Sequence, residues 1–328
     1  MKLFLPLLLF AFHLFTLLDA KDLALKQEIE IRLHSLPFEE RERLTMFFRR
    51  LFYHGDFAYT LLGQKPMGSI DYNLNLLAFP QFYKEPEKHL FLMALDKKGW
   101  RIWEQYKDLF PMKRYSLIKV EHDAFFGILL INKEKAYAVI KENLSLFQEL
   151  VGKKFSARKI LKLLCNGQFG YYHSNTPCSL TYYEALGLLY GYGKENVRAF
   201  IKRAQLSQNL RSLPIEVTSL PSKVMHCIEM EDSSTICSKC QPQNDLKVTP
   251  LACELNALLE KVQFIKGTNK NNPFLPLQKS MFLGNEQLDQ TRGIIKSYDD
   301  LNKTILEIYE SDKFLEIILG LLTSGAAQ

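Results

Sequence analysis

Tyr115-Ser-Leu-Ile-Lys-Val120 and Ala124-Phe-Phe-Gly-Ile-Leu-Leu-Ile-Asn132 are the two segments that decide the fold class. Only the short polar connection Glu121-His-Asp123 separates them, so we expect two strands joined by a tight turn. The second segment is apolar on both faces, which is typical of a strand buried inside a protein. The pair therefore predicts a short β-sheet in the N-terminal half of the chain.

The segments on both sides of this pair have helical periodicity. In the first of them, Leu25, Ile29 and Leu33 recur every four residues, which places them on one apolar face. The same reasoning predicts a second helix after Pro37 that ends at Gly55, and further helices over residues 98–109, 133–151, 156–164, 179–190, 194–206, 250–264 and 299–322, besides the first over residues 22–36. Residues 62–68 are predicted to form a loop because of their Gly and Pro content. We expect an α+β protein, predominantly helical, with a short β-sheet in the N-terminal half.

The first twenty residues resemble a secretory signal. Lys2 precedes an apolar run over residues 3–18 that ends at Leu-Asp-Ala20, and the run is shorter than the ~20 residues that cross a bilayer. We therefore predict a signal peptide over residues 1–20 and an exported protein, periplasmic or secreted, without a stable transmembrane anchor. An uncleaved anchor remains the alternative, since Leu18 stands where cleavage prefers a small residue.

Composition changes over residues 207–251, which contain Pro214, Pro221, Pro242 and Pro250, a serine-rich piece and several cysteines. Such a change indicates a domain boundary or a stapled insertion. We predict a mainly helical domain with the short sheet over residues 21–207. Residues 208–328 then form a cysteine-containing segment with C-terminal helices, which can pack as one domain with the preceding part.

Charge is unevenly distributed along the chain. Residues 21–208 contain 29 Lys and Arg against 20 Asp and Glu, whereas residues 209–328 contain 12 against 15. One interpretation is an anionic partner, such as a membrane surface or an acidic polymer. The other, which the sequence favours, is ordinary mixed charge on solvated helix faces. Nucleic acid is not expected as a partner, because no nucleic-acid recognition motif occurs in the sequence.

The sequence contains six cysteines, an even number: Cys165, Cys178, Cys227, Cys237, Cys240 and Cys253. In an exported chain this favours disulfides, and we expect Cys165 to pair with Cys178. One alternative is a zinc site in which Cys237 and Cys240 are joined by Cys227, Cys253 or His226. Another is a redox dithiol formed by Cys237 and Cys240. A single Cys-x-x-Cys pair is a weak signal for either, so no cofactor is predicted.

Recognisable catalytic motifs are missing from the sequence. It has neither a Gly-x-Ser-x-Gly elbow nor a His-Glu-x-x-His helix. Cys178 shares a segment with His173, but a paired thiol cannot act as a nucleophile. Acidic pairs such as Glu184 with Glu195, or Glu121 with Asp123, cannot be told apart from surface acids in one sequence. The catalytic residues are therefore unknown, and the sequence leans away from an enzyme.

Two segments carry a family resemblance: Phe57-Ala-Tyr-Thr-Leu-Leu-Gly-Gln-Lys-Pro66 and Leu186-Gly-Leu-Leu-Tyr-Gly-Tyr-Gly-Lys-Glu-Asn196. They resemble recurring segments of uncharacterised exported proteins from chlamydia-like intracellular bacteria. The resemblance implies a bacterial, host-facing protein, and it implies no activity, cofactor or catalytic residue.

These observations together predict an exported, non-catalytic binding or interaction protein of the bacterial envelope or the host interface, with a protein or envelope component as its partner. A secreted or periplasmic hydrolase with an unrecognised site is the first alternative. A zinc-binding or thiol-redox protein that uses Cys237 and Cys240 is the second.

Overall fold

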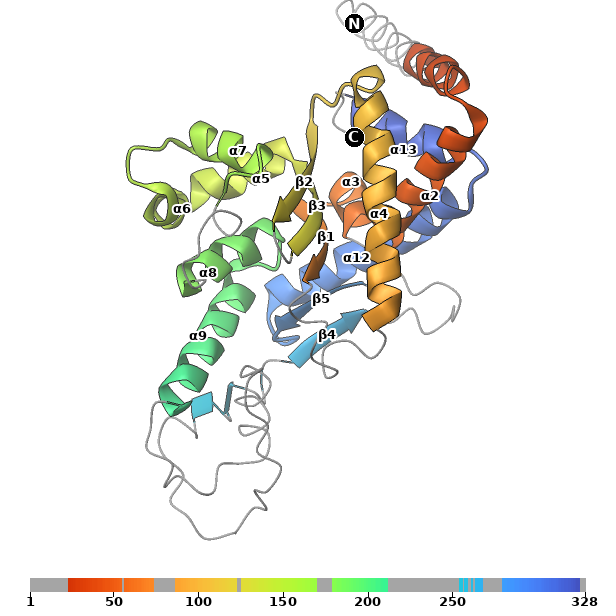
Figure 1. Cartoon of the computed structure of the whole chain (residues 1–328). Helices are drawn as coiled ribbons and strands as arrows, with labels where there is room; N and C mark the ends of the chain where they lie inside the picture. The colour runs from red at the N-terminus through yellow and green to blue at the C-terminus, as the bar shows by residue number, and fades with distance from the viewer. Residues whose placement is uncertain are drawn as a thin grey trace, which may run out of the picture.

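The computed structural model describes residues 23–54, 56–73, 86–122, 125–169, 179–211, 254–255, 257–258, 261, 263–267 and 279–324. These residues form a mostly helical α+β protein, which confirms the predicted fold class (Figure 1). The signal segment over residues 1–20 lies outside the described residues. Within them, no helix has the length and apolarity that crossing a membrane requires.

The predicted sheet is present and has three strands, β1 (Met67–Asn73), β2 (Tyr115–His122) and β3 (Phe125–Asn132), in the order β1-β3-β2. Both pairings are antiparallel, with Tyr115 opposite Asn132 and Met67 opposite Ile131. Every residue of the central strand β3 is buried, so the prediction of a buried strand is confirmed.

Strand β1 was not predicted, and the loop predicted over residues 62–68 overlaps its start. The segment is poor in strand-forming residues and gains its hydrogen bonds from β3, a partner far away in sequence. Gly68 brings β1 against the preceding helix, since a Cβ at this position would lie 2.9 Å from the Asp56 backbone. Gly68, which in the sequence indicates a loop, is therefore explained by the close packing of two backbones.

The sheet separates two hydrophobic cores. Alternate residues of β3 point to opposite faces, so that Phe126, Ile128 and Leu130 belong to one core, and Phe125, Leu129 and Ile131 belong to the other. The first core is covered by residues 23–36 and by α2 (Phe38–His54), α3 (Phe57–Leu62), α4 (Pro86–Tyr106), α12 (Asp289–Glu310) and α13 (Phe314–Thr323). The second is covered by α5 (Lys133–Glu142), α6 (Leu144–Val151), α7 (Ala157–Cys165) and α8 (Leu180–Leu189).

Several helix predictions are confirmed in position but not in extent. Ser156 and Ser179 cap α7 and α8 as expected. Each side chain accepts a hydrogen bond from the backbone N–H of the residue three positions later. The helix predicted over residues 98–109 begins at Pro86 and contains both tryptophans. The helix predicted over residues 133–151 is broken at Asn143, and the one predicted over residues 299–322 is broken between α12 and α13.

The C-terminal half contains a second, unpredicted sheet of two antiparallel strands, β4 (Gln263–Gly267) and β5 (Lys279–Gly284). The helix predicted over residues 250–264 therefore stops before β4, although residues 254–255, 257–258 and 261 are helical. Helix α9 (Lys194–Arg211) follows the bend at Gly191 and Gly193, whose positive φ angles of 73° and 82° glycine adopts without strain.

The C-terminal helices pack together with the N-terminal ones. Phe314 of α13 lies edge-on to Phe52 of α2 with ring centroids 5.6 Å apart, and both side chains belong to the first core. Helix α9 continues past residue 208 to Arg211. The predicted division of the chain at residues 207 and 208 stays a prediction, because residues 212–253 lie outside the described residues.

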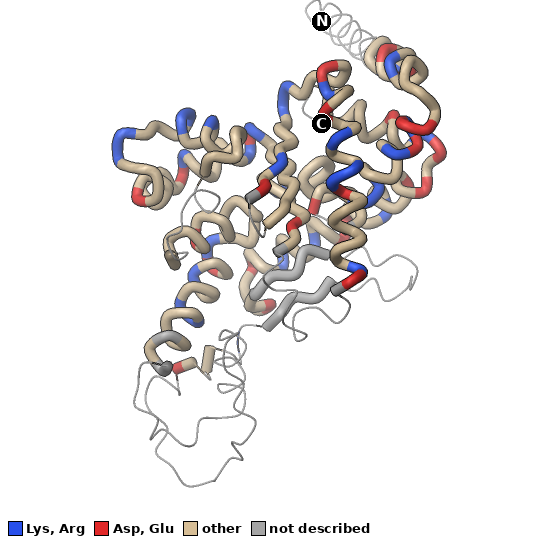
Figure 2. The backbone as a smooth tube through the Cα atoms, viewed as in Figure 1, with Lys and Arg blue, Asp and Glu red and all other residues tan. Residues whose placement is uncertain are grey.

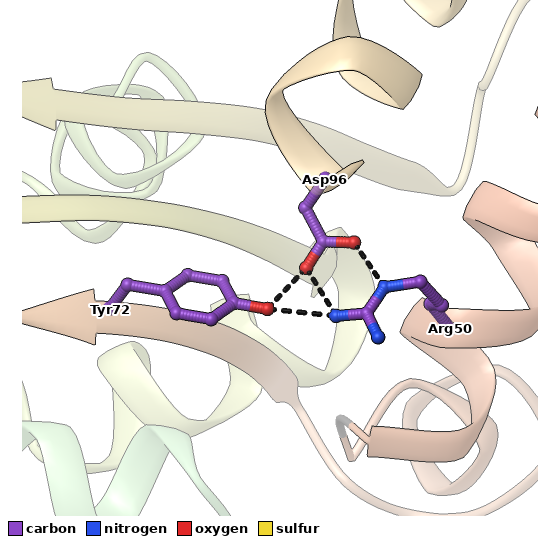
Figure 3. Close-up of polar contacts among 3 residues, drawn as sticks. All are labelled: Arg50, Tyr72 and Asp96. Atoms are coloured by element: carbon purple, nitrogen blue, oxygen red, sulfur yellow. Dashed lines mark hydrogen bonds and ion pairs between the residues drawn. The ribbon is translucent and has the colours of Figure 1, made fainter. Parts of the chain in front are cut away.

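One buried polar cluster ties α2, α4 and β1 together (Figure 3). Arg50 donates from Nε to Asp96 Oδ1 at 2.7 Å and from Nη2 to Asp96 Oδ2 at 2.9 Å. The hydroxyl of Tyr72 accepts from Arg50 at 2.9 Å and donates to Asp96. Asp96 is fully buried, so this bidentate pair satisfies a carboxylate that water cannot reach.

A second buried cation joins α3 to the α8–α9 bend and to α12. Lys65 is fully buried, and its Nζ lies 2.5 Å from Asp56 Oδ2. The ammonium also lies 5.0 to 5.9 Å from the ring centroids of Tyr190, Tyr192 and Tyr298, within cation–π range. This lysine follows the Gly-containing stretch 62–64. Its contacts with a carboxylate and with aromatic rings give it a structural role in the fold.

Candidate interaction surface

Helices α5, α6 and α7 form a lobe beside the sheet (Figure 1). The lobe, residues 133–165, contains eight basic residues and three acidic ones, in a chain whose total net charge is +6. Almost all of the net positive charge is therefore concentrated in one small part of the structure.

Five of these cations lie on α7 or in the turn before it. We define the α7 basic face as this set of exposed side chains: Lys153, Lys154, Arg158, Lys159 and Lys162. Residues three or four apart are neighbours on a helix surface, so the cations at positions 158, 159 and 162 share one side of α7. The opposite side is apolar and buried in the second core through Ala157, Ile160 and Leu164.

The turn that presents Lys153 and Lys154 is held by specific contacts. Gln148 Nε2 donates to the carbonyl of Lys153 at 3.0 Å and to that of Phe155 at 2.9 Å. Gly152 adopts a φ of 109°, in the left-handed region that favours glycine. Ser156 then caps α7. The basic face is consequently a defined surface and not the tip of a loose loop.

Within the described part of the chain, none of the five side chains forms an ion pair. Figure 2 shows their positive segments along the outer edge of α7, separated from the acidic segments of the lobe. Some cations elsewhere are paired, as where Lys97 and Lys119 lie 2.6 and 3.2 Å from Glu121. An unpaired set of cations has its attraction available for an external anion.

The same ion pairs argue against Glu121 as a general acid, the role considered for the pair Glu121 and Asp123. Its two lysine partners hold the pKa of the carboxyl below its ordinary value, whereas a general acid needs a raised pKa. Asp123, the other half, lies outside the described residues. Glu195 of α9 is exposed, and Glu184 of α8 is half-buried.

Of the predicted cysteine sites, the structure describes only Cys165, at the end of α7, where its thiol is free and half-buried. Burial raises the pKa of this thiol, which disfavours the reactive thiolate. Cys178, Cys227, Cys237, Cys240, Cys253 and His226 lie outside the described residues. No group of three or more His, Cys, Asp or Glu with the placement of a metal site occurs among the residues that are described.

The charge distribution in the sequence is compatible with an anionic partner but favours mixed charge on solvated helix faces. The signal for the basic face was present, because no acidic residue occurs between Glu149 and Glu184. What the sequence could not provide was the packing of α7, which directs its apolar side inward and leaves its cations without acids from other elements.

The fold and this surface together describe a mostly helical α+β protein with a basic face on α7. No protein-family model, no curated protein and no solved structure matches the chain.

Proposed function

We propose that the protein is an exported, non-catalytic binding protein whose α7 basic face docks on an anionic phospholipid surface, at the bacterial envelope or the host interface. The observation that carries the proposal is the set of five exposed cations, none of which has an acidic partner among the residues that the structure describes. Each Lys or Arg near an anionic membrane contributes about 1 kcal/mol of attraction. Five together suffice for reversible binding at moderate salt.

The proposed binding is electrostatic and peripheral. The apolar side of α7 is occupied by the second core, so it has no free apolar face to insert between lipids. Attraction between exposed charges is screened over about 8 Å at physiological ionic strength. Binding should therefore weaken steeply as salt is raised, which distinguishes it from insertion.

The test is co-sedimentation with vesicles of phosphatidylcholine alone or mixed with phosphatidylglycerol. We expect binding to the mixed vesicles only. The triple variant Arg158→Gln, Lys159→Gln, Lys162→Gln should bind about a hundredfold more weakly, because three of the five contributions are lost. The matched control is Lys98→Gln, Arg101→Gln, Lys107→Gln, which removes the same charges from exposed positions on α4 and the turn after it.

Equal loss of binding in the two triple variants would show that net charge, and not the α7 basic face, mediates attachment. Equal binding to both kinds of vesicle would also overturn the proposal. A preference for duplex DNA over the mixed vesicles would identify a different partner class.

Export is a separate part of the proposal and rests on the apolar run over residues 3–18 and the basic residues around it. Its test is the N-terminal sequence of the protein recovered outside the cytoplasm. A first residue of Lys21 is expected. A retained Met1 would instead indicate an anchor.

A further inference from the structure

A ligand-sized pocket lies away from the α7 basic face. It has a volume of about 350 Å³ and is formed where the α3–β1 connection, the start of β2, the start of α5 and the end of α13 meet. Two other cavities are about 10 Å³ each, room for a single water molecule. Pockets for small ligands begin at about 300 Å³.

The pocket combines apolar and charged walls. Its apolar part comes from Leu61, Leu62 and Leu321, and its charged part from Arg114, Glu134 and Lys135. Arg114 Nε lies 3.9 Å from Glu134 Oε2, and the arginine side chain is mostly buried while the glutamate is exposed. A mostly buried guanidinium beside apolar surface suits a carboxylate that carries a short hydrocarbon chain.

Lys135 is held at the pocket wall by its terminal nitrogen, which donates to the carbonyl of Gly63. Asn132 caps α5 by accepting from the backbone of Lys135, so the position of this residue is fixed at both ends. Burial lowers the pKa of its amine, and nearby Arg114 lowers it further, while Glu134 opposes the shift. Lysines that are desolvated or that lie beside a second cation are the ones that form imines with carbonyl compounds.

We propose that this pocket binds a small 2-oxo acid, whose carboxylate pairs with Arg114 and whose carbonyl carbon is captured by the Lys135 amine as a reversible imine. The nitrogen lone pair attacks carbon 2, and a carbinolamine forms. Both hydrogens of the neutral amine leave with the carbonyl oxygen as one water molecule, and nitrogen is left doubly bonded to carbon 2. No electrons are exchanged, so the step needs no oxidant or reductant.

Each half of the proposal depends on a different residue. Arg114 supplies affinity for the anion whether or not a carbonyl is present. Lys135 supplies the covalent bond, which hydrolysis reverses. The matched residue is Lys133, in the same turn of α5, whose Nζ donates to the carbonyl of Met112 at 3.2 Å and which does not line the pocket.

The experiment uses the full-length protein, 2-oxohexanoate and sodium cyanoborohydride, which reduces an imine to a stable secondary amine. We expect one adduct, with a mass gain of one ligand molecule less one oxygen atom, on Lys135 by peptide mapping. Lys135→Arg should abolish the adduct, and Lys133→Arg should leave it unchanged. Hexanoate, which has the carboxylate but no ketone, should compete with 2-oxohexanoate for the pocket without forming an adduct.

Arg114→Gln should raise the 2-oxohexanoate concentration for half-maximal trapping about tenfold or more, since a charge-assisted contact is lost. Labelling spread evenly over several lysines of the wild-type protein would overturn the proposal, and this reading does not depend on any variant folding. Equal trapping of neutral 2-hexanone would refute the role of Arg114. The absence of any adduct from 2-oxohexanoate on the wild-type protein would refute the imine.

Discussion

Arg50 and Asp96 form a bidentate ion pair in which the guanidinium is mostly buried and the carboxylate is completely so. The pair connects α2 to α4 across the first core, and Tyr72 of β1 completes it (Figure 3). Burial, with the neighbouring Asp96 carboxylate, raises the pKa of the tyrosine hydroxyl, so that it stays a hydrogen-bond donor. Three elements distant in sequence thus meet at one satisfied polar cluster.

Breaking this pair from one side should be strongly destabilising. Asp96→Leu leaves the Arg50 charge without its partner, and we expect the free energy of unfolding to fall by about 3–5 kcal/mol. The triple variant Arg50→Met, Asp96→Leu, Tyr72→Phe removes every polar member and should lose less than the single variant. Urea unfolding of the three proteins measures both values.

The surface pair of Arg43 and Glu39 provides the comparison, since both side chains are largely exposed and lie 3.3 Å apart. Glu39→Ala should change the free energy of unfolding by less than about 1 kcal/mol. A triple variant less stable than Asp96→Leu would show that the unpaired Arg50 charge is not the main cost of the single variant, contrary to our expectation.

Asp56 controls the protonation of Lys65. Burial lowers the pKa of the Lys65 amine, and Asp56 opposes that effect. Because the folded-state pKa is below the unfolded-state value, the unfolded chain binds more protons between the two, and stability rises with pH in that window. Asp56→Asn removes the opposing effect, so the pKa should fall further and the window should extend to lower pH.

We therefore expect Asp56→Asn to be least stable relative to the wild type at neutral pH and to approach it as the pH rises toward 10. Urea unfolding from pH 7 to pH 10 measures this, and Lys65→Met serves as the reference without the titrating amine. A stability difference that stays constant over this range would show that Lys65 has the same protonation state in both folded proteins.

Gly99 and Gly293 are both helical glycines and should respond in opposite directions to alanine. A Cβ at Gly99 of α4 would lie 2.4 Å from Phe47 Cδ2, whereas at Gly293 of α12 nothing lies within 4 Å. Gly99→Ala should cost about 1–3 kcal/mol through overpacking. Gly293→Ala should gain up to about 1 kcal/mol, because alanine is the better helix former. Thermal unfolding of both variants checks the contrast.

The parts of the fold that could be predicted depend on local sequence. The strand ending at Asn132 is apolar on both faces, and Ser156 and Ser179 stand where caps belong, so each could be read directly. Strand β1 and the breaks between helices could not. The apolar stripe continues across Asn143, and only tertiary packing decides that the chain turns there.

Neither surface on which we base a proposal could be located from sequence. The cations of the α7 basic face are visible in the chain, but whether acids from other elements reach them depends on packing. Arg114 directly precedes β2 and Lys135 lies in α5, and the two meet only because β2 and β3 pair and α5 follows β3 directly. Their shared pocket is a product of topology.

The reactivity of the Cys165 thiol provides a test of the predicted disulfides. This thiol has no disulfide partner among the described residues, and burial raises its pKa, so the thiolate fraction at pH 8 should be below that of an ordinary cysteine. We expect iodoacetamide to modify Cys165 slowly in the native protein and rapidly in urea, both without reductant, with peptide mapping as the readout.

The rate in urea is the internal reference, because unfolding removes both the burial and the pKa shift. Equal rates in the two states would show that the thiol is accessible in the native fold. If Cys165 resists labelling in urea until a reductant is added, it is bonded to another cysteine, and the expected pairing with Cys178 becomes the first to map. A free Cys165 instead leaves five of the six cysteines, an odd number, so at least one further thiol must be unpaired or join a second chain.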